Sequence, residues 1–274
     1  MSMKLPPKLT INDLVTHRFR GFAPNENTVE GFIAALDSGV RHLEFDIRVA
    51  RCGTPMIYHD AQAEDKSGQD RYLCNYKASE FARLGGTFSY IPTAEDLLDV
   101  AGRYASPETR LLIDIKDAGF EDEIIALVNL NRLQDRTVYV SWVPEVLYAV
   151  YARDPKAQLC LSHWCQTPPK SEHVGHDVFE AKNNDIPDTG RRYIHGGSSG
   201  WFTQGPLRGT LRDMVSFVCV PHDMVTADLV TDYHKDNIKV STYSYLDWDH
   251  IKAHKSDMNV DLFFIDNKDV FDAL

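Results

Sequence analysis

The sequence predicts a single (β/α)8 TIM barrel. Short β-rich runs alternate with helical patterns along most of the 274 residues, and several runs are almost wholly apolar, as in LLIDI at 111–115 and SFVCV at 216–220. Parallel strands that are covered on both faces have this composition. Eight such runs in 274 residues give about 34 residues per unit, which suits eight β/α units. A doubly wound open sheet is the alternative that the same alternation allows.

The predicted elements follow one another in the order that a barrel requires. Apolar and β-branched runs predict strands, whereas apolar residues three and four apart predict helices. Strands are expected at 14–17, 43–49, 111–115, 137–142, 158–163, 216–221, 239–245 and 262–266, and helices at 28–38, 93–104, 121–131, 144–153, 227–236 and 247–256.

Two long stretches interrupt this alternation. Residues 52–91 follow the second strand, are rich in Gly, Asp, Lys and Tyr, and predict a small insertion over one end of the barrel. Residues 165–214 contain several prolines and the glycine-rich segment HGGSSG, and they predict a long loop at the barrel rim. No internal repeat or linker divides the chain, so residues 1–274 are expected to form one domain.

Composition and charge narrow the class of protein. With 43% apolar and 25% charged residues the chain reads as an ordinary folded protein, and its net charge of −11 disfavours nucleic acid and anionic membranes as partners. The five cysteines include no Cys-x-x-Cys pair, so neither a disulfide framework nor a structural zinc site is indicated. The amino terminus lacks the apolar core of a signal peptide, so secretion is not expected. The most apolar stretch, 138–152, is interrupted by Pro144 and Glu145, so no transmembrane segment is expected. We therefore expect a cytoplasmic protein.

Two carboxylates lie on one face of the second predicted strand. In HLEFDIRV (42–49), Glu44 and Asp46 are two residues apart and point to the same side, while Phe45 points to the other. Neighbouring carboxylates inside a barrel repel each other unless a cation lies between them. Oxygen ligands favour a hard ion, so the pair predicts one divalent cation, Mg²⁺ or Ca²⁺. An exposed face on which the pair meets nearby arginines is the alternative.

The third predicted strand carries a similar pair. In LLIDIKD (111–117), Asp114 and Lys116 share one face. If that face looks into the barrel mouth, Asp114 is a third oxygen ligand and Lys116 is a cation suited to an anionic substrate. A surface ion pair between the two side chains is the alternative.

Histidines follow two of the β-rich pieces. VTHRFRG (15–21) ends the first strand in His17 and Arg18, and TPMIYHD (54–60) delivers His59. Together with the carboxylates and Lys116, these residues fit phosphodiester hydrolysis, in which a metal neutralises the phosphate while one histidine removes a proton and the other returns one. A metal-dependent lyase or aldolase and a catalytically silent binding module are alternatives on the same fold.

At this point the sequence resembles the glycerophosphodiester phosphodiesterase family. The family signature joins a His-Arg-Gly, an Asn-Thr helix start, a Glu-x-Asp strand and a His-Asp, and the counterparts here, in the same order, are His17-Arg18, Glu26-Asn27-Thr28, Glu44-Phe45-Asp46 and His59-Asp60. The likeness continues through IPTAEDLLD, LLIDIKD and the last three predicted strands. The family consists of (β/α)8 barrels with a small inserted segment after the second strand.

The resemblance implies a role for each matched residue. His17 and His59 would be the acid–base pair, and Arg18 and Lys116 would contact the phosphate. The implied metal ligands are Glu44, Asp46 and Asp114. The implied reaction is hydrolysis of a small-molecule glycerophosphodiester to glycerol 3-phosphate and an alcohol, with attack either by water or by the neighbouring glycerol hydroxyl.

The chain departs from the family pattern at three places. Phe19 and Arg20 stand before Gly21, Asp114 replaces the usual Glu, and Ser241-Thr242-Tyr243 stands where Trp-Thr is common. We expect Arg20 to turn outward. These departures leave substrate choice open, and a lysophospholipase D or sphingomyelinase D type of activity on a lipid-bearing diester is the close variant. An apolar groove at the barrel mouth would favour that variant.

Overall fold

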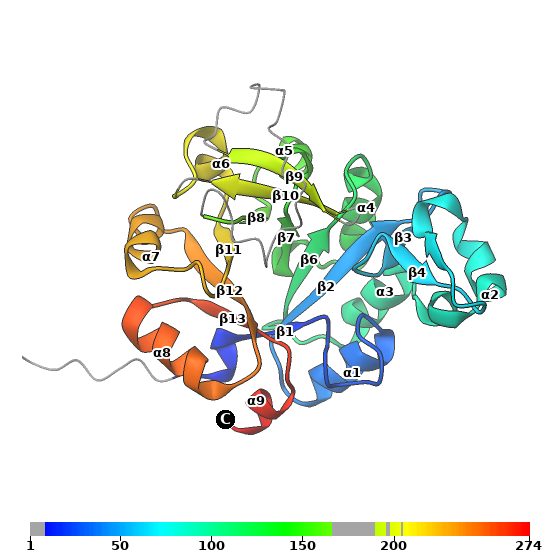
Figure 1. The fold of residues 1–274 in the computed structure, drawn as a ribbon, viewed down its shortest axis with the longest axis horizontal. Helices are drawn as coiled ribbons and strands as arrows, with labels where there is room; N and C mark the ends of the chain where they lie inside the picture. The colour runs from blue at the N-terminus through cyan, green and yellow to red at the C-terminus, as the bar shows by residue number, and fades with distance from the viewer. Residues whose placement is uncertain (1–8, 166–189, 196–197, 204) are drawn as a thin grey trace, which may run out of the picture.

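The eight predicted strands form a closed parallel barrel in the computed structural model, which describes residues 9–165, 190–195, 198–203 and 205–274 (Figure 1). Each strand boundary agrees with the prediction to within one residue, and the predicted TIM barrel is confirmed. The barrel strands are β1 (Leu14–His17), β2 (His42–Val49), β6 (Arg110–Ile115), β7 (Thr137–Ser141), β8 (Gln158–Ser162), β11 (Phe217–Pro221), β12 (Lys239–Tyr245) and β13 (Leu262–Ile265).

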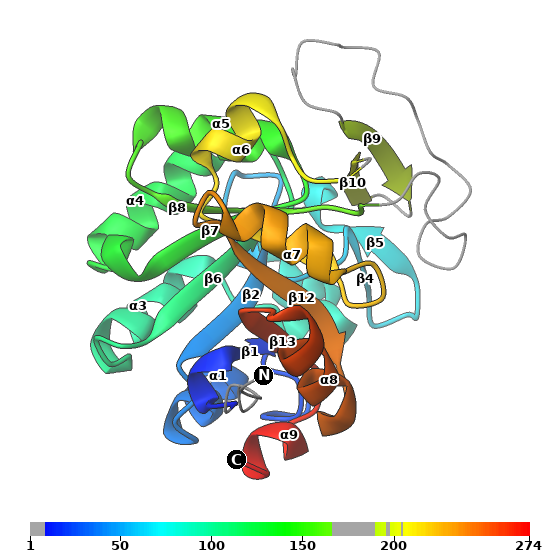
Figure 2. The ribbon, with the colours of Figure 1, turned by 90° about the vertical axis from the view of Figure 1, so that its left-hand side faces the viewer.

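Helices surround the barrel, as the ribbon shows from two sides (Figures 1 and 2). The six predicted helices are α1 (Val29–Asp37), α3 (Ala94–Tyr104), α4 (Glu121–Leu130), α5 (Pro144–Arg153), α7 (Ala227–His234) and α8 (Trp248–Met258). Among the described residues, three further α-helices were not predicted: α2 (Phe81–Leu84), α6 (Gly209–Met214) and α9 (Asp269–Asp272). Because these three are shorter than the window over which a helical period is visible, periodicity does not detect them.

Side-chain alternation along the strands separates two apolar cores. Val15, Leu112, Val140 and Cys219 fill the barrel interior, whereas Leu43, Phe45 and their equivalents pack against the helices. A buried aliphatic or aromatic side chain of this kind contributes about 1.5–3 kcal/mol relative to an exposed one. The interior core ends below the carboxyl ends of the strands, where the buried side chains become polar.

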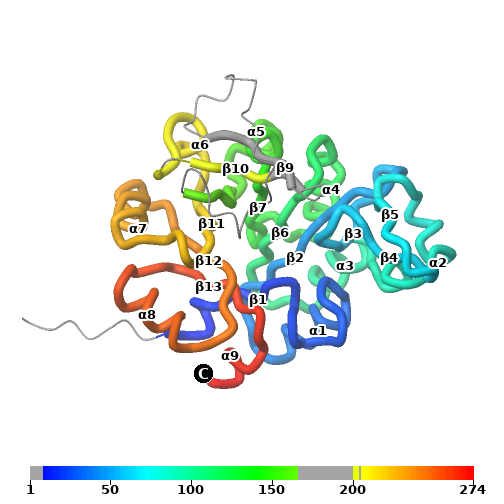
Figure 3. The backbone as a smooth tube through the Cα atoms, viewed as in Figure 1, coloured from blue at the N-terminus to red at the C-terminus, as the bar shows by residue number. Residues whose placement is uncertain are grey.

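Segment 52–91 builds a small structure of its own beside β2. It contains β3 (Pro55–Ile57), β4 (Gln62–Glu64), β5 (Asp70–Tyr72) and α2. β3 pairs antiparallel with β2 and so extends the main sheet, while β4 and β5 form a separate antiparallel pair. Figure 3 shows the tube leaving the barrel at β3 and returning to it at α3. A third apolar core, which we call the segment core, holds this part together: Ala50, Met56, Ala63, Leu73, Phe81, Phe88 and Ile91.

The described parts of 165–214 contain a hairpin and a helix where the sequence predicted a long rim loop. Strands β9 (Gly190–His195) and β10 (Ser198–Thr203) form an antiparallel hairpin, and α6 occupies the helix position before β11. In the view of Figure 2 the hairpin projects on the same side of the barrel as β4 and β5. Residues 166–189, 196–197 and 204 lie outside the described residues. Trp201 and Phe202 are buried, and Phe202 pairs with Trp164 just after β8, so β10 is joined to the barrel.

Candidate active site

The carboxyl ends of β1, β2 and β6 bring the predicted site residues together. Strand register pairs His17 with Glu44 and Asp46 with Asp114. Because alternate residues share a face, these side chains point into the barrel mouth while Phe45 packs outward. The mouth of a TIM barrel is where substrates bind in characterised enzymes of this fold.

Glu44, Asp46 and Asp114 form a tight carboxylate cluster. All three are buried, and one oxygen from each lies within 4.8 Å of the others. Asn27 donates from its amide nitrogen to Asp46 Oδ2 at 2.9 Å, while Thr28 caps α1. Lys116 Nζ lies 2.9 Å from Asp46 Oδ1 and 2.5 Å from Asp114 Oδ2.

The pKa values of Glu44 and Asp46 are shifted in opposite directions. Burial, reinforced by Asp46 and Asp114, raises the pKa of Glu44 well above its usual range. Burial also opposes ionisation of Asp46, but Lys116 and Arg18 hold its pKa well below the usual range. Lys116 and Arg18 therefore stabilise the anion of Asp46, whereas Glu44 is the member of the cluster that burial disfavours as an anion.

This cluster fits a hard divalent cation. Asp114 Oδ1 is buried and makes no hydrogen bond to the described part of the chain, so one ligand oxygen already lacks a partner. The donor set consists of carboxylate oxygens alone, which Mg²⁺ and Ca²⁺ prefer over softer ligands. The residues present thus match the predicted ion class.

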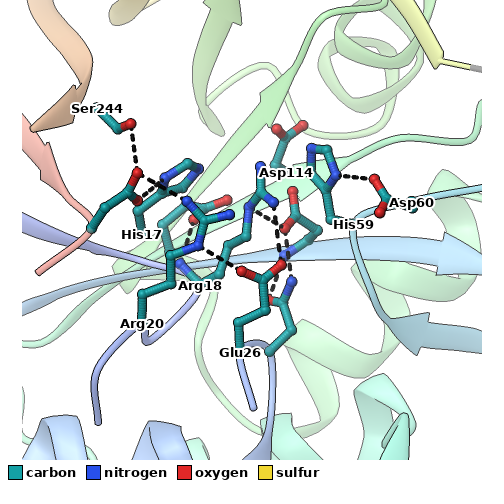
Figure 4. Close-up of polar contacts among 12 residues, drawn as sticks. His17, Arg18, Arg20, Glu26, His59, Asp60, Asp114 and Ser244 are labelled. Carbon is teal, nitrogen blue, oxygen red and sulfur yellow. Dashed lines mark hydrogen bonds and ion pairs between the residues drawn. The ribbon is translucent and has the colours of Figure 1, made fainter. Parts of the chain in front are cut away.

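His17 is held by a carboxylate that the sequence analysis missed. Its Nδ1 lies 2.6 Å from Asp266 Oδ1, just after β13, and Asp266 Oδ2 accepts a hydrogen bond from Ser244 at 2.6 Å (Figure 4). Burial opposes ionisation of Asp266, yet the hydrogen bond from His17 and further contacts hold its pKa below the usual range. Burial lowers the pKa of His17 despite Asp266. A neutral ring whose Nδ1–H is donated to Asp266 keeps Nε2 as an acceptor.

His59 comes from the loop after β3 rather than from a barrel strand. Its Nδ1 lies 2.6 Å from Asp60 Oδ1, and its side chain is 28% exposed. Arg48 fixes the backbone here, because its Nε donates to the carbonyl oxygen of His59 at 2.9 Å. Figure 4 shows His17 and His59 on opposite sides of Asp114. Two histidines with different surroundings therefore face one carboxylate cluster.

The loop after β1 turns sharply and places two arginines in the site. Arg18 and Phe19 both adopt left-handed backbone angles, with φ of 58° and 59°. Phe19 is fully buried, edge to face with Phe32 at 5.5 Å, so it anchors the turn in the outer core. Arg18 Nε then lies 3.3 Å from Asp46 Oδ2.

Arg20 does not turn outward as we had expected. Its Nε lies 2.6 Å from Glu26 Oε2, and its Nη1 lies 2.9 Å from Asp266 Oδ2. Glu26 also accepts from Arg18 Nη1 at 3.2 Å. The expectation was wrong because Phe19, between the two arginines, is the residue that points away from the site and into the outer core. The turn then directs Arg20 toward the site again.

Asp266 and Ser244 are polar residues of the site that sequence reasoning did not find, and it named Arg20 and Glu26 without giving them a role there. One signal was present, since Asp266 directly follows the apolar run LFFI at the carboxyl end of a strand. The pairing of His17 with a residue 249 positions away has no local pattern.

A parallel barrel with buried carboxylates and two histidines at its mouth defines a TIM-barrel enzyme. The model of the glycerophosphoryl diester phosphodiesterase family matches residues 15–177 of the 274. The chain therefore belongs to that family, whose members are phosphoric diester hydrolases.

Individual relatives agree with this assignment. A stretch of 61 residues, 22% of this chain, is 38% identical to the glycerophosphocholine phosphodiesterase GDE1 of Eremothecium gossypii, and it spans 4% of that protein's length. Among solved structures, a candidate glycerophosphoryl diester phosphodiesterase from Silicibacter pomeroyi is 20% identical with a TM-score of 0.71, over 97% of this chain and 93% of that one. A phosphodiesterase from Oleispira antarctica, in complex with the product sn-glycerol-3-phosphate, is 18% identical with a TM-score of 0.65, over 95% of each chain. At these identities the structures show a common fold.

Within the described ranges, no helix has the length and apolar character needed to cross a bilayer.

Proposed function

We propose that this chain hydrolyses glycerophosphodiesters to glycerol 3-phosphate and an alcohol, using one divalent cation, Mg²⁺ or Ca²⁺, held by Glu44, Asp46 and Asp114. The observation that carries the proposal is the buried three-carboxylate cluster with His17 and His59 beside it. When bound, the cation supplies positive charge against the phosphate. Family membership favours this reaction over the lyase or aldolase alternative.

His17 acts as the general base. The Asp266 carboxylate holds Nδ1 at 2.6 Å and leaves Nε2 as the acceptor. Because burial lowers its pKa, the ring is neutral over most of the physiological range. His17 takes the proton of the attacking hydroxyl group. Attack by water gives glycerol 3-phosphate directly. Attack by the neighbouring hydroxyl of the substrate glycerol gives a cyclic glycerol phosphate first, which water then opens to glycerol 3-phosphate.

His59 acts as the general acid. It is more exposed than His17, and its Nδ1 contacts Asp60 at 2.6 Å. His59 then gives its proton to the departing alkoxide, and the solvent-facing position lets it recover a proton after each turnover.

Arg18 and Lys116 are the phosphate contacts. Each already contacts Asp46, at 3.3 Å for Arg18 Nε and 2.9 Å for Lys116 Nζ, so both cations border the cluster. A guanidinium binds two phosphate oxygens at once, whereas an ammonium acts as a point charge. The two side chains stabilise negative charge as it grows on the phosphoryl oxygens.

Phosphorus NMR of glycerophosphocholine turnover tests the reaction and the metal together. We expect glycerol 3-phosphate as the product, loss of turnover after exhaustive chelation, and its return with Mg²⁺ or Ca²⁺. Glu44→Gln should be inactive but folded, because burial and the two neighbouring carboxylates already disfavour the charge that it removes. The matched control is Asp37→Asn, an exposed carboxylate at the end of α1, which should leave turnover unchanged.

Two results would contradict this proposal in different ways. Full turnover without any divalent ion would contradict the metal requirement. A screen in which the protein hydrolyses no glycerophosphodiester would contradict the substrate class.

A lipid-bearing choline ester is the second candidate substrate. Aromatic rings gather after β7 and β8 and on β12, where Trp142 lies 4.9 Å from Trp164 and 5.8 Å from Tyr243 between ring centroids. Aromatic faces attract quaternary ammonium groups, and the same rings suit an acyl chain. Comparing glycerophosphocholine with lysophosphatidylcholine and sphingomyelin at equal concentration distinguishes the two substrates.

We also propose a cytoplasmic location, consistent with five free cysteines, and fractionation of the source cells tests it.

A further inference from the structure

A cavity of about 690 Å³ lies at the opposite end of the barrel from the proposed active site. A volume of this size accommodates a small organic molecule. The cavity is lined by the first residues of six barrel strands, which are His42, Arg110, Gln158, Phe217, Lys239 and Leu262. It therefore lies at the amino-terminal ends of the strands, and we call it the basal cavity.

An apolar layer separates the basal cavity from the carboxylate cluster. His42, Glu44 and Asp46 alternate along β2, so they share the face that looks into the barrel, with His42 at the far end of it. Between the two ends, the barrel interior is filled by small and aliphatic side chains, among them Val15, Val140, Cys160 and Cys219. A molecule in the basal cavity is therefore kept apart from the carboxylates.

The lining of the basal cavity is positively charged, although the net charge of the chain is −11. Four lysine and arginine side chains line it, against three carboxylates. Two of these carboxylates already have cationic or hydrogen-bonding partners. Asp13 Oδ1 lies 2.8 Å from Lys255 Nζ, and Asp261 Oδ2 lies 2.8 Å from His234 Nε2. Three cations therefore remain for one carboxylate.

These three cations are Arg41, Arg110 and Lys239. None of them forms an ion pair with a residue of the described ranges, although Glu108 lines the same cavity. Strand register places Arg110 opposite His42. Burial, with Arg110 and Lys239 nearby, lowers the pKa of His42 to about 4, so this ring is neutral near pH 7. The three unbalanced cations attract an anion to the cavity.

The inner wall of the basal cavity is apolar. Leu112, Val138 and Leu262 are buried there, and the partly buried Phe217 packs against the same interior core. Lys239 Nζ lies 5.4 Å from the centre of the Phe217 ring, so a cation adjoins the apolar wall. An occupant that matches both surfaces has an anionic head and an apolar body, since an inorganic anion alone leaves the apolar wall in water.

We propose that the basal cavity binds a small amphipathic anion. Its carboxylate or phosphate head contacts Arg41, Arg110 and Lys239, and its apolar body lies against Leu112 and Phe217. A guanidinium pairs with two oxygens of such a head, whereas the ammonium supplies a point charge. The site lies at the other end of the barrel from the proposed hydrolysis, so binding alone tests it.

The test is calorimetric titration of the full chain with octanoate and with octyl phosphate. We expect saturable binding of one molecule per chain, and the tighter of the two anions identifies the preferred head. Octanol lacks the charge and acetate lacks the apolar body, so each should bind at least about tenfold more weakly. Raising the salt concentration should weaken binding, because ions screen exposed charges.

Two variants test the cations directly. Arg41→Gln and Lys239→Gln change exposed side chains, so both proteins should fold with an unchanged Tm. Each should weaken the binding of the anion about fivefold, because one charged contact is lost. Arg83→Gln is the matched control, an exposed arginine on α2 that contacts Glu80, and it should bind the anion as the unmodified chain does.

Trp142→Ala distinguishes the basal cavity from the aromatic rings at the barrel mouth, and it should leave octanoate binding unchanged. Loss of binding in this variant would place the probe at the mouth. Equal binding of octanol and octanoate would show that the cations play no part. Either result, or the absence of saturable binding by both anions, overturns the proposal.

Discussion

At the scale of single residues, the site depends on how each charged group is paired. Asp266 contacts three side chains, those of His17, Ser244 and Arg20. Its contact with Nδ1 orients the ring of His17. Lys116 lies against two members of the carboxylate cluster and limits the repulsion within it. Such pairings set which proton each group holds, and therefore which chemical role it can take.

Replacing Asp266 with Asn should lower kcat by about 10²-fold or more, because His17 loses the carboxylate that fixes its tautomer. Asp266 raises the pKa of His17, so its removal should also move the acidic limb of the kcat/KM profile to lower pH. Ser244→Ala removes only a hydrogen bond to Asp266 and should cost much less. An acidic limb that moves to higher pH would contradict the assigned pairing.

Arg20→Ala should lower kcat several-fold, because the guanidinium holds Asp266 and Glu26 in place. Arg18→Lys should be nearly as harmful as Arg18→Ala, since an ammonium cannot hold two oxygens at once. Arg103→Ala is the control, an exposed arginine on α3 that pairs with Asp99. Steady-state kinetics check all four variants, and an Arg20→Ala enzyme with unchanged kcat would show that its contacts are dispensable.

At the scale of elements, the strands were predictable and the short pieces were not. An apolar run such as LLIDI on β6 is buried on both faces, so its composition alone identifies it. The carboxylates were found because strand alternation fixes their face. In contrast, α6 is only one and a half turns long, and β10 is defined by pairing with β9 rather than by its own sequence.

The turn after β1 provides a test at this scale. Phe19→Ala should lower the free energy of unfolding by about 3–5 kcal/mol, because it empties a fully buried aromatic position. The same change loosens Arg18 and should reduce activity in the fraction that stays folded. Tyr104→Ala, at an aromatic residue that is 70% exposed on α3, should change stability by no more than about 0.5 kcal/mol. Urea unfolding measures both.

At the scale of the whole molecule, long-range contacts close the barrel and could not be predicted from local patterns. Asp266 and His17 meet because β13 pairs with β1, which joins the two ends of the chain. His163 makes a comparable link, with Nδ1 2.9 Å from Thr203 Oγ1 and Nε2 3.0 Å from the Tyr233 hydroxyl. It ties the end of β8 to β10 and α7.

His163 should make stability depend on pH. Burial lowers its pKa to about 3, below the unfolded value of 6.5. The unfolded chain therefore binds a proton first, and the free energy of unfolding should fall as pH drops below 6.5, by up to about 1.4 kcal/mol per pH unit. His163→Gln should unfold with a shallower pH dependence between pH 6 and 4. Equal slopes in urea titrations of both proteins would contradict a buried neutral ring.

His59 lies in segment 52–91, most of which packs around a core separate from those of the barrel. The strands that carry His17 and the carboxylates share one continuous core, whereas segment 52–91 packs around its own, built from Met56, Phe81 and their neighbours. Because β3 pairs with β2, a substitution in the segment core should shift His59 more than it shifts the carboxylates on β2 and β6. Changes in the segment core can therefore alter proton transfer from His59 to the leaving group, while the carboxylates that would hold the cation stay in place.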